Sequence, residues 1–235
     1  MRVNNKWGIG VVLAAAVLLT GCSGAAEKPA DDKKPEAGAS QEAEAPKNDC
    51  PELTEGATVD GAALGPCVID ALDDIAGYAA TTTMMGMEST SKYNPSERAI
   101  ESNTSVGSMI VIGDQAWVKS PTGDWQVADP TSSDPVIAGL STGATAAAAM
   151  DPTTIAASLG GDFTVTGTGE RLGQKVYLVE GSIEQQGAKV DMVFEITADY
   201  ATLASSSKTE AGGQSIESNM VVTEWDVKQD IVAPL

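Results

Sequence analysis

Two serine and lysine pairs in the chain have the spacing of a catalytic motif. Ser89 with Lys92 and Ser205 with Lys208 both match Ser-x-x-Lys, the nucleophile motif of penicillin-recognising enzymes. Both pairs fall in segments that we predict to be strands, and the companion motifs Ser-Asp-Asn and Lys-Thr-Gly are missing. The 235 residues also contain no histidine, which excludes Ser-His-Asp and Cys-His nucleophiles and His-ligated zinc or haem. We therefore predict no catalytic residues and no enzyme.

Cys22 has the most specific chemical context in the chain. Arg2 and Lys6 precede an uncharged apolar run at residues 8–19, which is too short to span a bilayer and is typical of a secretory signal. The run ends in Leu19-Thr20-Gly21-Cys22, which resembles the bacterial lipobox, whose cysteine is acylated and becomes the mature N-terminus. The sequence thus predicts a lipoprotein signal peptide at residues 1–21 and acyl chains such as palmitate on Cys22. An ordinary signal peptide with a coincidental cysteine is the alternative.

Residues 22–49 are predicted to be the acylated cysteine and a disordered tether. The stretch 23–49 contains no Val, Ile, Leu, Met or aromatic residue, so it has nothing to bury against the entropy of ordering. A flexible coil of this length reaches roughly 30 Å. We therefore expect the remaining domain, residues 50–235, at the cell membrane, lipid-anchored on its extracytoplasmic face.

The charge of the chain limits its partners. There are 33 acidic and 14 basic residues, a net charge of −19 and a pI of about 4.1. A polyanion without a basic cluster repels phosphate backbones and anionic lipid headgroups. We expect no nucleic acid partner, and we expect membrane attachment through the lipid anchor and not through charge.

Cys50 and Cys67 remain once Cys22 is acylated, and an even number of cysteines in an oxidising compartment predicts a disulfide. Closing this loop contributes roughly 3 kcal/mol to stability. Two free thiols in a redox or metal site are the alternative, although a close Cys-x-x-Cys spacing is missing. Three nearby carboxylates are interpreted as a solvated helix face, so no metal and no cofactor is expected. They are Asp70, Asp73 and Asp74.

Proline and glycine signals predict three helices. Pro66 is expected at the first position of a helix that Gly77 ends. The apolar stripe of this helix is Val68, Ile69, Leu72 and Ile75. Asp134-Pro135 and Asp151-Pro152 each place an N-cap residue before a proline and predict short helices, at 135–141 and 152–159.

Period-2 segments between turn residues predict strands on both sides of these two short helices. The expected strands are 78–92, 96–112, 115–120, 163–169, 174–183, 188–198, 202–210, 214–225 and an edge piece at 229–233. Strands interrupted by a helical insert indicate an antiparallel α+β domain.

A series of short motifs runs in a fixed order along the predicted domain. They are Ala116-Trp117-Val118-Lys119, Gly123-Asp124-Trp125, the two Asp-Pro helix starts, Phe194-Glu195-Ile196-Thr197-Ala198-Asp199, Trp225, and Asp230-Ile231-Val232-Ala233-Pro234. In this order they resemble the actinobacterial LppX/LprG/LprA lipoprotein family over about residues 68–235. The resemblance implies a strongly curved antiparallel sheet, a LolA-like half-barrel, with a few helices covering its concave face. It also implies an apolar cavity that carries a lipid or lipoglycan.

One strand shows clearly which residues would line such a cavity. Met192, Phe194 and Ile196 alternate with Asp191 and Glu195, so they share one face of their strand. Extending this period to the other strands gives the full set of cavity candidates: Met84, Ile110, Ile112, Val165, Met192, Phe194, Ile196, Met220 and Val222. Residues 135–159 are the expected gate. An ordinary packed core has the same pattern and is the alternative for each of these residues.

Two functions follow from these expectations. The first is an envelope lipoprotein that binds or carries a lipid or lipoglycan with long acyl chains in an apolar cavity. The second is a surface lipoprotein with a closed core that binds an envelope protein partner.

Overall fold

The computed structural model describes residues 50–149, 159–185, 187–211 and 214–234. The chain divides into two units, Met1–Asn48 and Asp49–Leu235, and all described residues belong to the second. The expected signal peptide, Cys22, the tether and nearly all of the expected helix 152–159 lie outside the described residues. Within the described part, no helix is long and apolar enough to cross a membrane.

The described residues form one sheet of twelve strands, in the order β1-β8-β9-β10-β11-β12-β2-β3-β4-β5-β6-β7. All neighbouring strands are antiparallel. Their bounds are β1 Thr58–Asp60, β2 Tyr78–Met84, β3 Met87–Asn94, β4 Ala99–Thr104, β5 Gly107–Ile112, β6 Gln115–Lys119, β7 Gln126–Val127, β8 Asp162–Arg171, β9 Gln174–Gln185, β10 Ala188–Thr197, β11 Thr202–Ala211 and β12 Gln214–Trp225. The bounds of β6 and of β8 to β12 match the sequence predictions closely.

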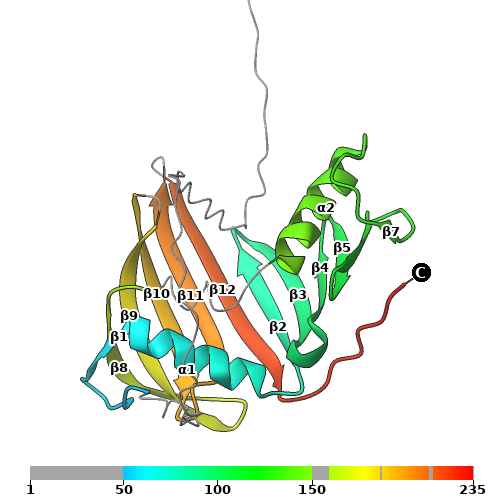
Figure 1. The fold of residues 1–235 in the computed structure, drawn as a ribbon. Helices are drawn as coiled ribbons and strands as arrows, with labels where there is room; N and C mark the ends of the chain where they lie inside the picture. Colours follow the sequence, from blue (N-terminus) through cyan, green and yellow to red (C-terminus); the bar gives the residue numbers. More distant parts are fainter. Residues whose placement is uncertain (1–49, 150–158, 186, 212–213, 235) are drawn as a thin grey trace, which may run out of the picture. The chain divides into compact units, whose positions relative to one another are not determined.

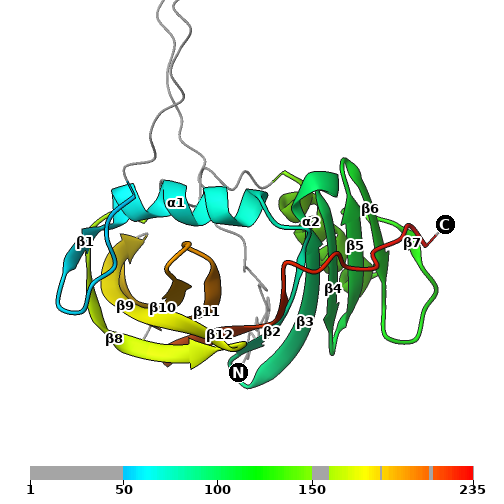
Figure 2. The same cartoon turned by 90° about the horizontal axis from the view of Figure 1, so that it is seen from below.

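The sheet is strongly curved. Register shifts interrupt the ladders at Val165/Gly167, Glu195/Ile196 and Val222/Glu224, and such bulges bend the strands that carry them. Figures 1 and 2 show the helix α1, Gly61–Asp73, spanning the opening of the curved strands from the β1 side to the β3 side. The α+β fold class, a curved antiparallel half-barrel with helices on its concave face, is therefore confirmed.

Helix α1 begins five residues before the predicted start. The Asp60 carboxylate accepts a hydrogen bond from the Ala62 N–H at 3.0 Å and caps the helix, so Pro66 lies inside it. Gly61 is required at the first position because a Cβ there would lie 2.2 Å from the Leu159 carbonyl oxygen. The predicted start at Pro66 was wrong because Asp60 caps the helix upstream, so Pro66 lies in the second turn, where it has no N–H to donate to the preceding turn.

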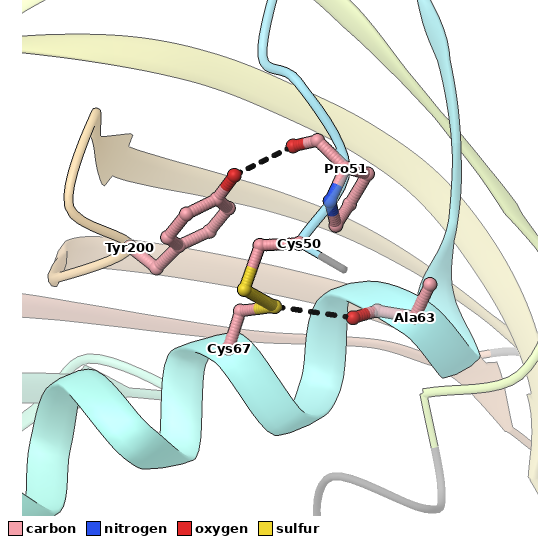
Figure 3. Close-up of a disulfide and its surroundings, with 5 residues drawn as sticks. All are labelled: Cys50, Pro51, Ala63, Cys67 and Tyr200. Atoms are coloured by element: carbon pink, nitrogen blue, oxygen red, sulfur yellow. Dashed lines mark hydrogen bonds between the residues drawn. A yellow bond between two sulfur atoms is a disulfide. The ribbon is translucent and has the colours of Figure 1, made fainter. Parts of the chain in front are cut away.

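A disulfide joins Cys50 to Cys67 on α1, as the sequence predicts, with a Cα–Cα distance of 5.9 Å (Figure 3). Beside it the Tyr200 hydroxyl, from the turn between β10 and β11, donates to the Pro51 carbonyl at 2.7 Å. Leu53 follows in the chain and is buried. The disulfide and this hydrogen bond therefore link α1 and the segment before β1 to the sheet.

The second helix, α2, spans Pro135–Ala148 and so continues beyond the predicted end at residue 141. The Asp134 carboxylate caps it by accepting from the N–H groups of Val136 and Ile137 at 2.8 and 3.3 Å. The extension follows from alanine, the strongest helix former, in the last turn and a half.

The predicted strands 78–92 and 96–112 are each two strands. Two-residue turns divide them, at Met85-Gly86 and at Ser105-Val106. Met85 and Gly86 both have positive φ, 51° and 78°, which is the pattern of a type I′ hairpin turn. Methionine is not a usual residue for this conformation, so Gly86 was the only turn signal there.

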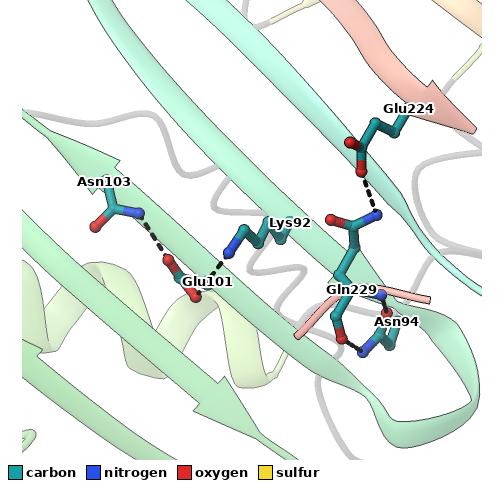
Figure 4. Close-up of polar contacts among 6 residues, drawn as sticks. All are labelled: Lys92, Asn94, Glu101, Asn103, Glu224 and Gln229. Atoms are coloured by element: carbon teal, nitrogen blue, oxygen red, sulfur yellow. Dashed lines mark hydrogen bonds and ion pairs between the residues drawn. The ribbon is translucent and has the colours of Figure 1, made fainter. Parts of the chain in front are cut away.

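The C-terminal segment is not the predicted edge strand, since residues 229–233 form no strand. Instead the Asn94 side chain makes two hydrogen bonds to the Gln229 backbone, both 2.9 Å long, donating to the carbonyl and accepting from the N–H (Figure 4). Beyond it, Ile231 packs against Ile110 and Trp117. An asparagine amide, which can mimic a backbone peptide group, thus replaces strand pairing.

Candidate functional site

The two faces of the sheet differ in charge. Antiparallel partners share a face, so the register from Met192 through each strand to Val118 of β6 defines one inner face. All charged residues of β10, β11, β12, β3, β4 and β6 lie on the opposite, outer face, and β2 and β5 have none. They are Lys189, Asp191, Glu195, Lys208, Glu210, Glu217, Glu224, Glu88, Lys92, Glu101 and Lys119. The inner face of these eight strands is therefore uncharged.

Cross-strand pairs join the outer charges. Lys92 lies 3.6 Å from Glu101, which also accepts from Asn103 at 2.9 Å (Figure 4). Lys208 and Glu217 pair across 3.3 Å. The hydrogen bonds from Lys189 and Ser182 lower the pKa of Asp191. These pairs keep the outer face polar and hydrated.

An apolar cluster occupies the inner face under the first half of α1. Its centre is Phe163, which is fully buried and lies 5.9 Å from the Phe194 ring, centroid to centroid. The buried members are Leu53, Val59, Leu64, Leu159, Phe163, Val165, Val179 and Ile196. Met192 and Phe194 pack against this cluster but are only half-buried.

A second apolar cluster occupies the inner face under α2. Ile137 and Ala144 of the helix pack on Val111 of β5 and Val118 of β6, and all four are buried. Met109 and Leu140 pack against them. Helix α2 is thus seated on the sheet through an apolar contact of its own.

Between the two clusters, two rows of half-buried or exposed residues cross five strands of the inner face. One row is Met192, Ser207, Ser218, Met84 and Met87, and the next is Phe194, Ser205, Met220, Thr82 and Ser89. At about 4.8 Å between strands each row is roughly 19 Å long, the length of an extended long acyl chain. Methionine, phenylalanine and small hydroxyl residues make this strip apolar or neutral along its whole length. We call it the central strip.

Aromatic residues lie on the inner face at the other end of strands β12, β2 and β3. Tyr78 of β2 lies 5.7 Å from Tyr93 of β3 and 6.0 Å from Trp225 of β12, centroid to centroid. Burial, and to a lesser degree Tyr93, raises the pKa of Tyr78 to about 12. Burial also raises the pKa of Tyr93, with a smaller contribution from Asp73. Both rings are therefore neutral at physiological pH.

Seven of the nine cavity candidates share the inner face. Val165, Ile196 and Val222 are no more than 1 % exposed and are core residues. The other four belong to the central strip and are half-buried: Met84, Met192, Phe194 and Met220.

Ile110 and Ile112 were assigned to the wrong face. Their partners are Glu101 and Ala99 of β4, which lie on the outer face, where Ile231 and Trp125 cover this patch. In β5 the run Met109-Ile110-Val111-Ile112 is apolar on both faces, so the sequence of this strand alone does not show which residues face inward. Met109 and Val111 are the inner residues of this strand.

Sequence reasoning missed the hydroxyl residues of the central strip. The strand Thr202–Ala211 has hydroxyl residues on both faces and no apolar residue at every second position. Only its pairing with β10 and β12 therefore assigns Ser205 and Ser207 to the inner face. Met87 was missed because its turn was missed. Of the expected gate, α2 lies on the inner face, whereas residues 150–158 lie outside the described part of the chain.

The Ser-x-x-Lys pairs are not arranged for catalysis. Ser89 and Ser205 lie on the inner face, while Lys92 and Lys208 lie on the outer face with their acidic partners. A spacing of three in a strand always separates two side chains in this way. Among the described residues no group of His, Cys, Asp or Glu could hold a metal ion.

The outer face has a shallow hollow of about 220 Å³ over β10, β11 and β12. Arg171 reaches across it and makes two hydrogen bonds to the Glu195 carboxylate, at 2.7 and 2.9 Å. The bonds to Glu195 raise the pKa of Arg171. The hollow is therefore bordered by a satisfied ion pair.

No protein-family model matches the sequence, and no curated protein matches it either. Among solved structures, the lipoprotein LppX from Mycobacterium tuberculosis is similar, with a TM-score of 0.49 and 13% identity over 74% of this chain and 98% of that one. LprF from Mycobacterium bovis has a TM-score of 0.49 and 10% identity, covering 74% and 96%. An uncharacterized conserved protein from Thermus thermophilus has a TM-score of 0.39 and 11% identity, covering 71% and 87%. LppX is a member of the family that the sequence motifs resemble.

Proposed function

We propose that residues 50–235 bind an uncharged long-chain lipid along the central strip, and that the protein carries this lipid at the extracytoplasmic membrane surface, anchored through Cys22. The observation that supports this most strongly is the segregation of charge. Eight consecutive strands place every charged side chain on the outer face, although a solvated strip would tolerate charge on both faces.

The exposure of the strip supports the same proposal. Met84, Met192, Phe194 and Met220 are half-buried, while neighbouring inner residues such as Val165 and Val222 are fully buried. Apolar side chains that the fold leaves partly uncovered, in a contiguous strip, are typical of a ligand site. Flexible methionine side chains adapt to ligands of different shape.

The hydroxyl residues of the strip are compatible with an acyl chain. In the strip, Ser89 donates to the Thr82 carbonyl at 3.3 Å; one row beyond it on the inner face, Thr209 donates to the Lys189 carbonyl at 3.1 Å. A hydroxyl satisfied by the backbone presents its aliphatic side to a ligand at little cost. No ion pair has to be broken when a chain enters.

Two adjacent serines of β11 provide the test. Ser207 lies in the central strip, opposite Met192, and Ser206 lies on the outer face, opposite Val193; both are half-buried. Because Asp49–Leu235 is one compact unit, this segment can be purified and titrated with an uncharged fluorescent diacylglycerol. Ser207→Lys should weaken binding at least tenfold, since the ligand would desolvate the ammonium group, whereas Ser206→Lys should change it less than twofold.

Both variants should retain the wild-type circular dichroism spectrum. Equal loss in the two variants would contradict the assignment of the ligand to the inner face. No binding by the wild type would instead favour the scaffold with an envelope protein partner.

A further inference from the structure

Exposed apolar side chains gather at the tips of two neighbouring hairpins. Met85 and Met87, at the β2–β3 turn, are 63% and 49% exposed, and Val106, at the β4–β5 turn, is 40% exposed. Because β3 pairs with β4 through Ser89 and Thr104, these two turns lie side by side at the same edge of the sheet (Figure 1). We call Met85, Met87 and Val106 the tip patch.

Met85 occupies a turn position that methionine rarely adopts. Both central residues have positive φ, and asparagine followed by glycine is the favoured sequence for this turn. A methionine here is strained and exposed, and it gains nothing from burial. Leu172 has the same positive φ in the same kind of turn, so the exposed apolar neighbours Met87 and Val106, and not the backbone strain, distinguish Met85.

The tip patch is continuous with the central strip. Met87 pairs directly with Met84, which pairs with Ser218, and both methionines lie on the inner face. An acyl chain that leaves the strip at this edge therefore passes along methionine side chains to the tip. The aromatic cluster of Tyr78, Tyr93 and Trp225 lies at the other end of the same strands.

We propose that the tip patch is the edge at which this domain touches the lipid surface of the membrane to load and release its ligand, an inference that rests on the proposed function. The expected tether of residues 22–49 has an r.m.s. reach of roughly 30 Å, which lets the anchored domain approach the bilayer. Three side chains are far too few for a stable protein interface, which buries about 800 Å² on each partner. They suffice for a weak contact with the bilayer, because the tether keeps the effective concentration of the domain at the membrane high.

The contact is apolar and not electrostatic. Neither tip contains Lys or Arg: the turns and their flanks read Met84-Met85-Gly86-Met87-Glu88 and Thr104-Ser105-Val106-Gly107. Attraction to anionic headgroups is therefore missing, and the contact should persist at high salt.

The opposite edge of the sheet offers a matched control. Leu172-Gly173, between β8 and β9, has the same turn geometry, with φ of 50° and 74°, and Leu172 is 45% exposed. Its neighbours are charged: Glu170, Arg171 and Lys175. Leu172 is thus an exposed apolar turn residue without an apolar patch around it.

The test uses the full acylated chain in phosphatidylcholine vesicles. Met85→Cys and Leu172→Cys are labelled separately with an environment-sensitive fluorophore; Cys50 and Cys67 are in the disulfide, so each variant has one added thiol. Lipids brominated on their acyl chains should quench the label at residue 85 at least threefold more than the label at residue 172, at low and at high salt. Equal quenching at both sites, or none at residue 85, would overturn the proposal.

A second pair of variants links the contact to ligand exchange. Met85→Asn and Leu172→Asn both place asparagine where this turn favours it, so both should fold. Met85→Asn should slow transfer of a fluorescent diacylglycerol from vesicles at least fivefold and leave its equilibrium binding unchanged; Leu172→Asn should change neither. If Met85→Asn transfers the diacylglycerol at the wild-type rate and binds it normally, the exchange role of the tip patch is refuted. If the wild-type protein does not bind the diacylglycerol, the proposed function is refuted.

Discussion

The inner and outer faces of the sheet are made from alternate residues of the same strands, and one apolar patch on each face is covered to a different degree. On the outer face Ile110 and Trp117 are covered by the protein's own C-terminal segment, through Ile231. On the inner face Met192, Phe194 and Met220 are left half-buried. Under the proposed function, the accessible inner patch is the one that the lipid covers.

The largest effect should come from the buried part of the inner face. Phe163→Ala should lower the free energy of unfolding by about 3–5 kcal/mol, because Phe163 is fully buried and its loss leaves a cavity beside Phe194. The next residue, Thr164, is exposed on the outer face, and Thr164→Ala should change stability by less than about 0.5 kcal/mol. Urea unfolding measures both. Similar values for the two variants would contradict the assignment of the faces.

The disulfide should contribute next, because it ties α1 to the segment before β1. Replacing Cys50 and Cys67 together with serine should lower the free energy of unfolding by about 3 kcal/mol. Reduction of the wild-type protein should reproduce this loss, since it opens the same loop. A double variant with wild-type stability would show that α1 is held over the inner face by packing alone.

The aromatic cluster of Tyr78, Tyr93 and Trp225 predicts a dependence of stability on alkaline pH. The pKa of Tyr78 is raised to about 12 in the folded protein, so the unfolded chain, with an ordinary pKa near 10, loses this proton first. Its contribution is fully present below pH 10 and is lost as the pH rises to 12, a difference of roughly 2–3 kcal/mol. Urea unfolding at pH 9 and pH 11.5 should show a smaller loss in Tyr78→Phe than in the wild type. Parallel losses would mean that Tyr78 is more hydrated than its packing indicates.

The smallest effects belong to the outer charges. Arg171 and Glu195 are 34% and 23% exposed in their side chains, so Glu195→Gln should cost about 1 kcal/mol or less. Lys189 and Asp191 are 63% and 56% exposed, and Asp191→Asn should be nearly neutral. Stability against salt concentration measures both pairs. Large losses in the free energy of unfolding would indicate that these ion pairs stabilise the fold. Small losses would agree with the account that the charges lie on the outer face because the inner face must stay uncharged.

The sequence predicted elements well where local signals are strong. The strands from β8 to β12 and the disulfide follow from period-2 alternation and from cysteine pairing, and the Asp134 cap located the start of α2. Sequence-based prediction failed where tertiary contacts determine the bounds of an element. The Met85-Gly86 turn has an unsuitable residue in it, and α1 begins at Gly61 because Asp60 caps it and Gly61 fits against the Leu159 carbonyl oxygen.

The site was predictable only in part for the same reason. Met192 and Phe194 alternate with charged residues, so their face can be read from one strand. Ile110 and Ile112 lie in a run that is apolar on both faces, and Ser205 and Ser207 lie in a strand without apolar alternation. For such strands the face depends on the register with both neighbours, which a single strand does not encode.

The most direct test of the central claim is to locate the bound acyl chain. A diacylglycerol with a diazirine on its acyl chain is bound to the wild-type protein and photolysed, and tandem mass spectrometry assigns the modified residues. Labels should fall on Met84, Met192, Phe194 and Met220, the half-buried residues of the central strip. Labels on Val193, Asn219 and Val221, their neighbours on the outer face, would contradict the claim that the inner face holds the lipid.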